Sequence, residues 1–248
     1  MQLKIGLCGA TGKTSGAINK RVEDLPNRFK IISKFSSRNS TADLPDFCKL
    51  PDVIIDFSSP AILLKLLECC ILHNKPLIIG TTGLSRDHIN LLHKASVKIP
   101  IVYSANMSMG ANLIASLLAK CVNALDNEHY DTEIIEYHHR YKKDAPSGTA
   151  IMLGHEIAKA KNLNFEENVV FVRTSNEKRN PHEIGISSVR GGGIKGDHEI
   201  IFASDNEIIK LKHQVISRDA YADGALKAAL WVYNQKPGLY SMQDVIKL

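Results

Sequence analysis

The chain has 248 residues, of which 44% are hydrophobic and 23% are charged, a composition typical of a folded globular protein. The net charge is only +5 and aromatic residues make up 6%, so the dense basic stripe and stacking aromatics typical of nucleic-acid-binding proteins are missing. No apolar run approaches the roughly 20 residues that a membrane-spanning helix needs. We therefore expect no nucleic-acid partner and no membrane, and the positive excess suits a small anionic ligand.

The cysteine pattern bears on compartment and metal binding. The five cysteines are odd in number and form no C-x-x-C pair, so neither a disulfide framework nor a zinc site is expected. No H-E-x-x-H motif occurs either, and we expect no bound metal. The chain begins with an apolar strand pattern and no charged-then-apolar leader. These features together favour a cytoplasmic protein.

The first half of the chain alternates strand and helix patterns. Strands are expected at 3–8, 30–35, 52–57, 77–79 and 99–103, and helices from the first glycine-rich turn to about 23, at 60–72 and at 85–95. Strands that alternate with helices predict an α/β fold with a doubly wound, Rossmann-like parallel sheet.

The second half has a different pattern. Helices are expected at 108–124, 149–161 and 217–233, and strands at 132–137, 169–172, 183–189, 197–203 and 207–213. Several strands in succession predict a smaller α+β domain with a mixed, mostly hairpin-connected sheet. The expected domains are a dinucleotide-binding domain at 1–107, completed by 217–248, and a substrate-binding and oligomerisation domain at 108–216.

A glycine-rich turn joins the first strand to the first helix. Glycines let the backbone approach a pyrophosphate, and the helix start supplies N–H groups, so this setting predicts a dinucleotide site although the spacing is not G-x-G-x-x-G. A triphosphatase phosphate loop is the weaker alternative, because it requires glycine where Leu7 stands. The predicted contacts are Gly9, Ala10, Thr11, Gly12, Lys13 and Thr14.

Three further loops follow strands of the same predicted sheet. The second strand ends at Ser36, Ser37 and Arg38 with no acid to bind a ribose, which favours NADPH over NADH. The loops after the fourth and fifth strands are expected to line the nicotinamide, through Gly80, Thr81 and Thr82 and through Ser104, Ala105, Asn106 and Met107.

The segment from Glu136 to Ala150, EYHHRYKKDAPSGTA, concentrates the most chemistry. It offers a proton donor, fixed cations and the free N–H groups of a helix start, which together suit a small anionic substrate. Plainer interpretations remain open: the His-His pair with Arg140 is compatible with a solvated loop, and Asp144–Ser147 with a helix cap. His198 and His213 lie in strand patterns and are expected to be structural, and the roles of Arg190 and Arg218 stay open.

These motifs together resemble the 4-hydroxy-tetrahydrodipicolinate reductase (dihydrodipicolinate reductase) family over nearly the whole chain. The most specific match is residues 136–150 against the family signature E-x-H-H-x-x-K-x-D-A-P-S-G-T-A. Further matches are Asp56-Phe-Ser, Gly80-Thr-Thr-Gly83, Asn106, Arg190-Gly-Gly, Gly196-Asp-His198, Ser217-Arg218 and Pro237-Gly-Leu-Tyr240.

The resemblance implies an NAD(P)H-dependent reductase of a cyclic imine dicarboxylate in lysine and diaminopimelate biosynthesis, usually a homotetramer. It implies that His138 is the acid/base residue and Lys142 the second proton donor. Substrate-binding positions correspond to His139, Ser147, Gly148 and Thr149. A related dehydrogenase of another small amino acid, such as aspartate, is the alternative, and a non-catalytic dinucleotide sensor is a third hypothesis.

The glycine-rich turn departs from the family pattern G-A-x-G-R-M-G. Lys13, Thr14 and Ser15 occupy its last three places. Lysine keeps the cation but loses the planar fork of arginine. Ser15 stands where glycine allows close helix–strand packing, and Gly16 is expected to compensate. These changes affect the expected cofactor preference and affinity, but not the reaction.

Overall fold

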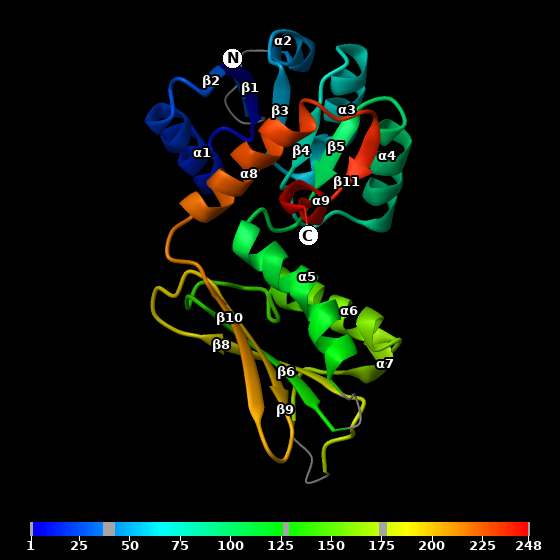
Figure 1. Cartoon of the computed structure of the whole chain (residues 1–248). Helices are drawn as coiled ribbons and strands as arrows, with labels where there is room; N and C mark the ends of the chain where they lie inside the picture. Colours follow the sequence, from blue (N-terminus) through cyan, green and yellow to red (C-terminus); the bar gives the residue numbers. More distant parts are fainter. Residues whose placement is uncertain (1, 37–42, 126–128, 174–177, 248) are drawn as a thin grey trace. The chain divides into compact units, whose positions relative to one another are not determined.

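The computed structural model describes residues 2–36, 43–125, 129–173 and 178–247 (Figure 1). The chain divides into two compact units, one of residues 1–109 with 218–248 and the other of residues 110–217. We call them unit 1 and unit 2. Their limits differ by one or two residues from the expected 107/108 and 216/217 junctions. The roles expected of the two units stay predictions.

Unit 1 contains a six-stranded sheet in the order β11-β5-β4-β3-β1-β2, and every neighbouring pair is parallel. Its strands alternate buried residues between two faces, so each face carries its own apolar cluster. The predicted Rossmann-like sheet is confirmed. The strands are β1 (Leu3–Cys8), β2 (Phe29–Phe35), β3 (Val53–Asp56), β4 (Leu77–Ile79), β5 (Pro100–Tyr103) and β11 (Gly238–Tyr240).

Helices cover both faces of this sheet (Figure 1). One face packs against α1 (Lys13–Asp24), α8 (Asp219–Val232) and α9 (Met242–Ile246). The other packs against α2 (Leu44–Lys49), α3 (Leu63–Leu72) and α4 (Arg86–Ser96), with the short 3₁₀ helix η1 (Pro60–Ile62) before α3.

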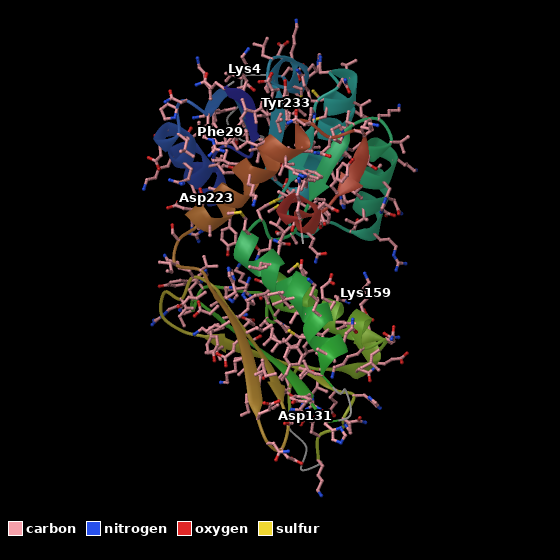
Figure 2. All side chains as sticks on the ribbon, in the orientation of Figure 1. Lys4, Phe29, Asp131, Lys159, Asp223 and Tyr233 are labelled. Carbon is pink, nitrogen blue, oxygen red and sulfur yellow. The ribbon has the colours of Figure 1, made fainter. Side chains whose placement is uncertain are left out.

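The C-terminal segment belongs to unit 1, since α8 packs against α1. Arg21 of α1 donates to the carboxylate of Asp223 of α8, labelled in Figure 2, at 2.8 Å. A Cβ atom at Gly224 would lie 1.7 Å from the carbonyl oxygen of Met107, so glycine is required for the close approach of α8 to this loop. The contact between Arg21 and Asp223 and the close packing at Gly224 therefore hold α8 on unit 1.

Unit 2 contains a five-stranded sheet in the order β10-β9-β6-β8-β7. The predicted mixed sheet is confirmed, but the expectation of mostly hairpin connections is wrong. Among the described strands of this sheet, only β9–β10 is a hairpin. The pairs β6–β8 and β7–β8 are parallel, and β6–β9 joins segments that are distant in the chain. The strands are β6 (Asp131–His138), β7 (Val169–Val170), β8 (Ile184–Arg190), β9 (Asp197–Ala203) and β10 (Ile208–Gln214).

The core of unit 2 lies on one face of its sheet. Helices α5 (Met109–Ala124), α6 (Gly148–Ala160) and α7 (Phe165–Asn168) contribute to one apolar cluster with Ile134, Ile186 and Ile200 of the sheet. Helix α6 lies between β6 and β8 in the chain, which explains why these strands are parallel rather than a hairpin. In the described ranges of both units, none of the helices has the length and apolar character to cross a membrane.

Candidate functional site

The glycine-rich turn of unit 1 is shaped by its backbone. Gly9 has φ +77°, and a Cβ atom there would lie 2.3 Å from the carbonyl oxygen of Phe57. The N–H groups of Gly9 and Ala10 both donate to the Phe35 carbonyl, at 2.9 and 3.0 Å, which fixes the turn against the end of β2. Gly12 is the N-cap of α1, and its lack of a side chain leaves the first amides of α1 uncapped. An uncapped helix start with a glycine turn is a suitable site for a phosphate group.

The ends of β3 and β4 are joined by a buried polar network. The Thr81 hydroxyl donates to Asp56 Oδ2 at 2.7 Å and accepts from the Ser58 N–H at 3.0 Å. Burial raises the pKa of the Asp56 carboxyl, and the hydrogen bonds from Ser58 and Thr81 oppose this rise. The Thr81 hydroxyl is used within the protein and holds the loop in place. Any contact between this loop and a cofactor would therefore be made by backbone atoms and by exposed Thr82.

The loop after β5 is also held from within. Ser104 Oγ donates to the Asn106 carbonyl at 2.7 Å, and the Ser108 N–H donates to Asn106 Oδ1 at 2.8 Å. Ser104, Asn106 and Met107 are buried, whereas Ala105 is exposed. The side chains in this loop therefore set the course of the backbone.

Most predicted cofactor residues of unit 1 follow the carboxyl ends of parallel strands, and they meet at one edge of the sheet. Thr11 Oγ1 lies 3.2 Å from Ser36 Oγ, which links the glycine turn to the end of β2. Ser37 and Arg38 lie outside the described residues, so their predicted role is untouched by the structure.

The expectation that Gly16 compensates for Ser15 is wrong. Ser15 is fully buried, and its hydroxyl contacts no hydrogen-bond partner in the part of the chain that the structure describes. Gly16 faces solvent, and a Cβ atom there would meet nothing within 4 Å. Ser15 shares the inward face of α1 with Ile18 and Val22. The serine is accommodated directly, at the cost of an unpaired hydroxyl.

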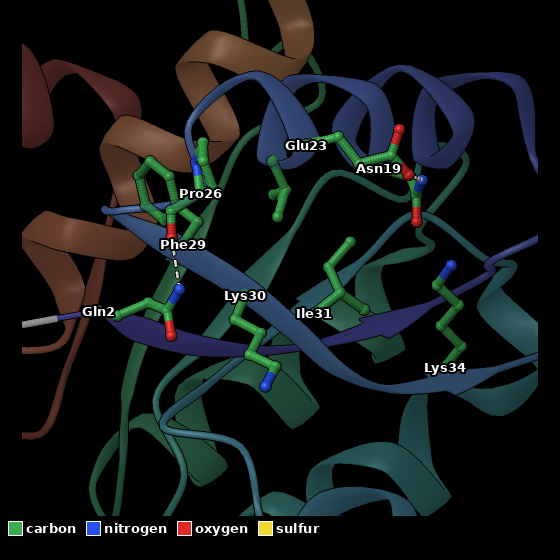
Figure 3. Close-up of a pocket in the computed structure, with 9 residues that line it drawn as sticks. Gln2, Asn19, Glu23, Pro26, Phe29, Lys30, Ile31 and Lys34 are labelled. Atoms are coloured by element: carbon green, nitrogen blue, oxygen red, sulfur yellow. Dashed lines mark hydrogen bonds between the residues drawn. The ribbon is translucent and has the colours of Figure 1, made fainter.

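Figure 3 shows a hollow in unit 1 that is separate from these loops. It lies beside α1 and edge strand β2, and its lining includes Gln2, Asn19, Glu23, Lys30 and Lys34. None of the predicted site residues that the structure describes lines it. The hollow gives no support to the predicted cofactor site.

Glu136 is the centre of the polar cluster in unit 2. Its side chain is completely buried, and its two oxygens accept four hydrogen bonds. Oε2 accepts from His138 Nδ1 at 2.6 Å and from Arg190 Nη1 at 2.7 Å, while Oε1 accepts from Arg190 Nη2 at 2.6 Å and from the Ser147 N–H at 3.1 Å. Burial raises the pKa of Glu136, but the hydrogen bonds, first that of Arg190, outweigh burial and bring the pKa to about 2. The group is therefore an ionised, fully coordinated carboxylate.

His138 follows Glu136 on the same face of β6, because side chains two apart on a strand point the same way. Burial lowers the pKa of His138, and the carboxylate of Glu136 opposes this effect. A Cβ atom at Gly196 would lie 3.0 Å from His138 Nε2, so a glycine at this place keeps that ring nitrogen uncrowded. The imidazole is thus held at Nδ1, and a side chain at position 196 would crowd its Nε2.

Lys142 forms an ion pair with Asp144, whose two oxygens lie 2.8 and 2.7 Å from Nζ. The lysine side chain is 20% exposed and the aspartate side chain 62% exposed. Burial raises the pKa of Asp144, but the hydrogen bond from Lys142 outweighs burial and the pKa is lowered. The charge of Lys142 contributes to the lowered pKa of His138, which places both predicted catalytic groups in one electrostatic neighbourhood.

The start of α6 lies in the same cluster. Ser147 is its N-cap and accepts from the Ala150 N–H at 3.2 Å, and His198 Nε2 lies 3.0 Å from the same hydroxyl. The buried Ser147 side chain therefore caps the start of α6. Exposed Gly148 and half-buried Thr149 are left to bind the predicted substrate carboxylate. In the described part of unit 2, no acceptor or donor pairs with the buried Nδ1 of His139.

The sequence analysis assigned no role of its own to Glu136, left the role of Arg190 open and expected His198 to be structural. Glu136 could have been found, since it lies two residues before His138 on a strand. Arg190 and His198 reach the cluster through pairing: Arg190 stands opposite His138 across β6–β8, and His198 stands opposite Glu136 across β6–β9. Burial lowers the pKa of His198 to about 3, and the His138 charge adds to this effect. Local sequence patterns do not reveal such registers.

Comparison with known proteins assigns the chain to a family. A family model described as the N-terminus of dihydrodipicolinate reductase matches residues 3–107, and a C-terminal model of the same enzyme matches residues 110–246. The chain belongs to the dihydrodipicolinate reductase family. It is 50% identical over 246 residues to the 4-hydroxy-tetrahydrodipicolinate reductase of Rickettsia canadensis, covering 99% of both chains. That of Zymomonas mobilis is 42% identical over 249 residues, covering 99% of this chain and 98% of the relative.

A solved structure is also similar. Dipicolinate-bound dihydrodipicolinate reductase from Paenisporosarcina sp. TG-14 has a TM-score of 0.78 at 22% identity, with both chains covered completely, which supports the fold. Family membership confirms the predicted NAD(P)H-dependent reductase function in lysine and diaminopimelate biosynthesis. DAP dehydrogenase of C. glutamicum shares only the fold, with a TM-score of 0.53 at 10% identity, so the dehydrogenase alternative gains no support.

Proposed function

We propose that unit 1 binds NADPH in preference to NADH at the turn between β1 and α1. The bare backbone of Gly9 and the uncapped start of α1 fit a pyrophosphate, and exposed Lys13 adds a cation. The described end of β2 carries Ser36 and no carboxylate, which suits a 2′-phosphate better than a free ribose hydroxyl. When bound, the nicotinamide supplies the hydride.

Unit 2 binds the cyclic imine dicarboxylate. One carboxylate of the substrate is held by the amides of Gly148 and Thr149 at the start of α6, with His139 and Lys142 as further donors. The observation that carries this assignment is the concentration of donors and cations around one buried carboxylate, Glu136. A dianionic ligand is stabilised by these groups.

His138 and Lys142 supply the protons of the reaction. Electrons that arrive with the hydride move toward the ring nitrogen of the substrate, and a cation nearby lowers the barrier for this shift. The lowered pKa of His138 makes its protonated form a stronger acid, and a bound dicarboxylate favours that form through its negative charge. Lys142 is an ammonium held in place by Asp144.

This assignment is tested by two substitutions with matched controls. His138→Gln and Lys142→Ala are each expected to lower turnover by roughly 10²-fold or more, with NADPH affinity unchanged. Exposed Lys143, which adjoins Lys142, and exposed His182 provide the controls Lys143→Ala and His182→Gln, which should keep normal turnover. Steady-state NADPH oxidation measures the first effect and calorimetry the second. Near-normal turnover in both site variants would overturn the roles proposed here.

A cytoplasmic homotetramer is the assembly that we infer. Helices α5, α6 and α7 pack on one face of the sheet of unit 2, and the opposite face carries Ile135, Tyr137, Val189 and Ile201. Such a face suits burial against another copy of the chain. The free cysteines suit a reducing compartment. Native mass spectrometry tests the assembly, and a monomer at micromolar concentration would contradict it.

A further inference from the structure

The coordination of Glu136 exceeds what a simple ion pair requires. Its four hydrogen bonds come from three places: the predicted acid on β6, the guanidinium on β8, and the first amide before α6. Arg190 also donates to the Asp144 carbonyl at 2.7 Å, within the segment that carries Lys142. One carboxylate and one guanidinium therefore connect both predicted proton donors to the helix start that would hold the substrate.

Stability alone does not explain this arrangement. Burying a carboxylate and a guanidinium carries a desolvation penalty that their attraction often fails to offset, so a buried ion pair is weak evidence for a stabilising role. The Glu136 side chain is completely buried and that of Arg190 is 19% exposed. Besides Arg190 and Ser188 of β8, Glu136 binds two groups of the predicted catalytic segment, at His138 and Ser147.

We propose that Glu136, held by Arg190, is a positioning residue that fixes the tautomer of His138, so that Nδ1 carries a permanent proton and Nε2 is the atom that exchanges protons with the substrate. This inference rests on the proposed function of His138. The carboxylate accepts the Nδ1–H bond at 2.6 Å, and an ionised carboxylate accepts only from a protonated nitrogen. The opposite nitrogen, Nε2, adjoins Gly196, where a Cβ atom would approach to 3.0 Å.

The proton step follows from this geometry. In the imidazolium form the Nε2–H bond breaks, its electron pair stays on the ring, and the substrate atom that has gained electron density from the hydride takes the proton. The neutral ring keeps its Nδ1–H bond to Glu136. No proton moves to Glu136, because two hydrogen bonds from Arg190 stabilise its ionised form. Solvent then returns the proton to Nε2.

Arg190 has a second role in this scheme. Without a cation, a buried carboxylate beside the imidazole would take up a proton itself. The bidentate contact of Arg190 keeps Glu136 ionised and also fixes the orientation of the carboxylate plane. A lysine at position 190 would keep the charge but lose the planar fork.

The test combines kinetics with a direct observation of the ring. Glu136→Gln removes the anion but keeps the size of the side chain. We expect kcat to fall roughly 10²-fold, with the KM for NADPH unchanged. We also expect the alkaline limb of the kcat/KM profile to move to lower pH, since the carboxylate that stabilises the imidazolium is gone. Glu133→Gln is the matched control, because Glu133 lies on the same strand and binds Arg173 and Arg179 instead.

Nitrogen-15 NMR of labelled wild-type protein reads the tautomer directly and does not depend on any variant folding. The proposal requires neutral His138 to carry its proton on Nδ1. The proposal would be overturned by a neutral His138 ring that is protonated on Nε2. It would also be overturned by a Glu136→Gln variant that keeps the wild-type pH profile. If His138→Gln keeps normal turnover, the proposed function fails. If His138→Gln is inactive while Glu136→Gln matches wild type in rate and pH profile, only the positioning role fails.

Discussion

The two units build their candidate sites from different kinds of group. In unit 1 the glycine turn offers backbone amides, and the side chains of Thr81 and Ser104 are used to hold loops in place. In unit 2 the site consists of charged side chains, organised around the buried pair of Glu136 and Arg190. Unit 1 should therefore be sensitive to added volume, and unit 2 to changes of charge.

The largest expected effect is the loss of Arg190. Arg190→Met leaves the buried carboxylate of Glu136 without its main partner, and we expect the free energy of unfolding to fall by about 3 kcal/mol. Arg21→Met in unit 1 is the control, because Arg21 and its partners Asp24 and Asp223 are partly exposed and should contribute little. Urea unfolding measures both. Equal losses would mean that the two units do not differ in their dependence on charge.

Added volume at Gly9 should produce the next largest effect. Gly9→Ala combines a positive φ with a clash against the Phe57 carbonyl, and we expect a loss of about 3 kcal/mol together with weaker NADPH binding. Gly83→Ala is matched to it, since Gly83 has the same φ of +77° but open space around its Cβ position. The control should lose only about 1 kcal/mol. Thermal unfolding with and without NADPH gives both values. Similar losses in the two variants would show that the close contact between Gly9 and Phe57 does not shape the glycine turn.

Acid should weaken unit 2 through His198. The unfolded side chain gains a proton near pH 6.5, but in the folded protein the pKa is about 3, so acidification below pH 6.5 favours the unfolded state. Between pH 6.5 and 4.5 we expect a loss on the order of 2 kcal/mol, absent from His198→Gln. Below pH 4.5, Glu136 adds to the loss as the pH falls toward its folded pKa of about 2. The loss of stability can be measured by the amide hydrogen exchange rates of β6 and β9 as the pH is lowered. A pH-independent exchange rate, after correction for intrinsic chemistry, would show the account of His198 to be wrong.

The smallest expected effect is a gain. Gly16→Ala on the exposed face of α1 adds a Cβ atom that meets nothing within 4 Å, and a helical glycine costs about 0.5–1 kcal/mol relative to alanine. The variant should be more stable by that amount in thermal unfolding. A loss of stability would show that the space above α1 is less open than the structure indicates.

Unit 1 was the more predictable of the two from sequence. Its strands alternate with helices, and a parallel sheet places the ends of such strands at one edge, so the loops at Gly9, Gly80 and Ser104 were predicted to converge. Short elements escaped notice: α2, β11 and α9 have between three and six residues each, too few to show a period. The inward face of Ser15 could have been predicted, since Ile18 and Val22 follow it at helical spacing.

The site of unit 2 was predictable only in part. The segment from Glu136 to Ala150 contains His138, Lys142 and the helix start, all close in sequence. Arg190 and His198 join them through the registers of β6 with β8 and β9, and local patterns carry no information on which strands pair. The same limit explains why a hairpin-connected sheet was expected where the strands are parallel.

A crystal structure of the chain with NADPH and dipicolinate tests most directly whether unit 1 binds its ligand through backbone amides and unit 2 through charged side chains. We predict the pyrophosphate at the amides of Lys13 and Thr14, one dipicolinate carboxylate at the amides of Gly148 and Thr149, and His138 Nε2 facing the ring. A cofactor bound away from the glycine turn, or a dipicolinate that contacts neither the start of α6 nor His138, would contradict this account.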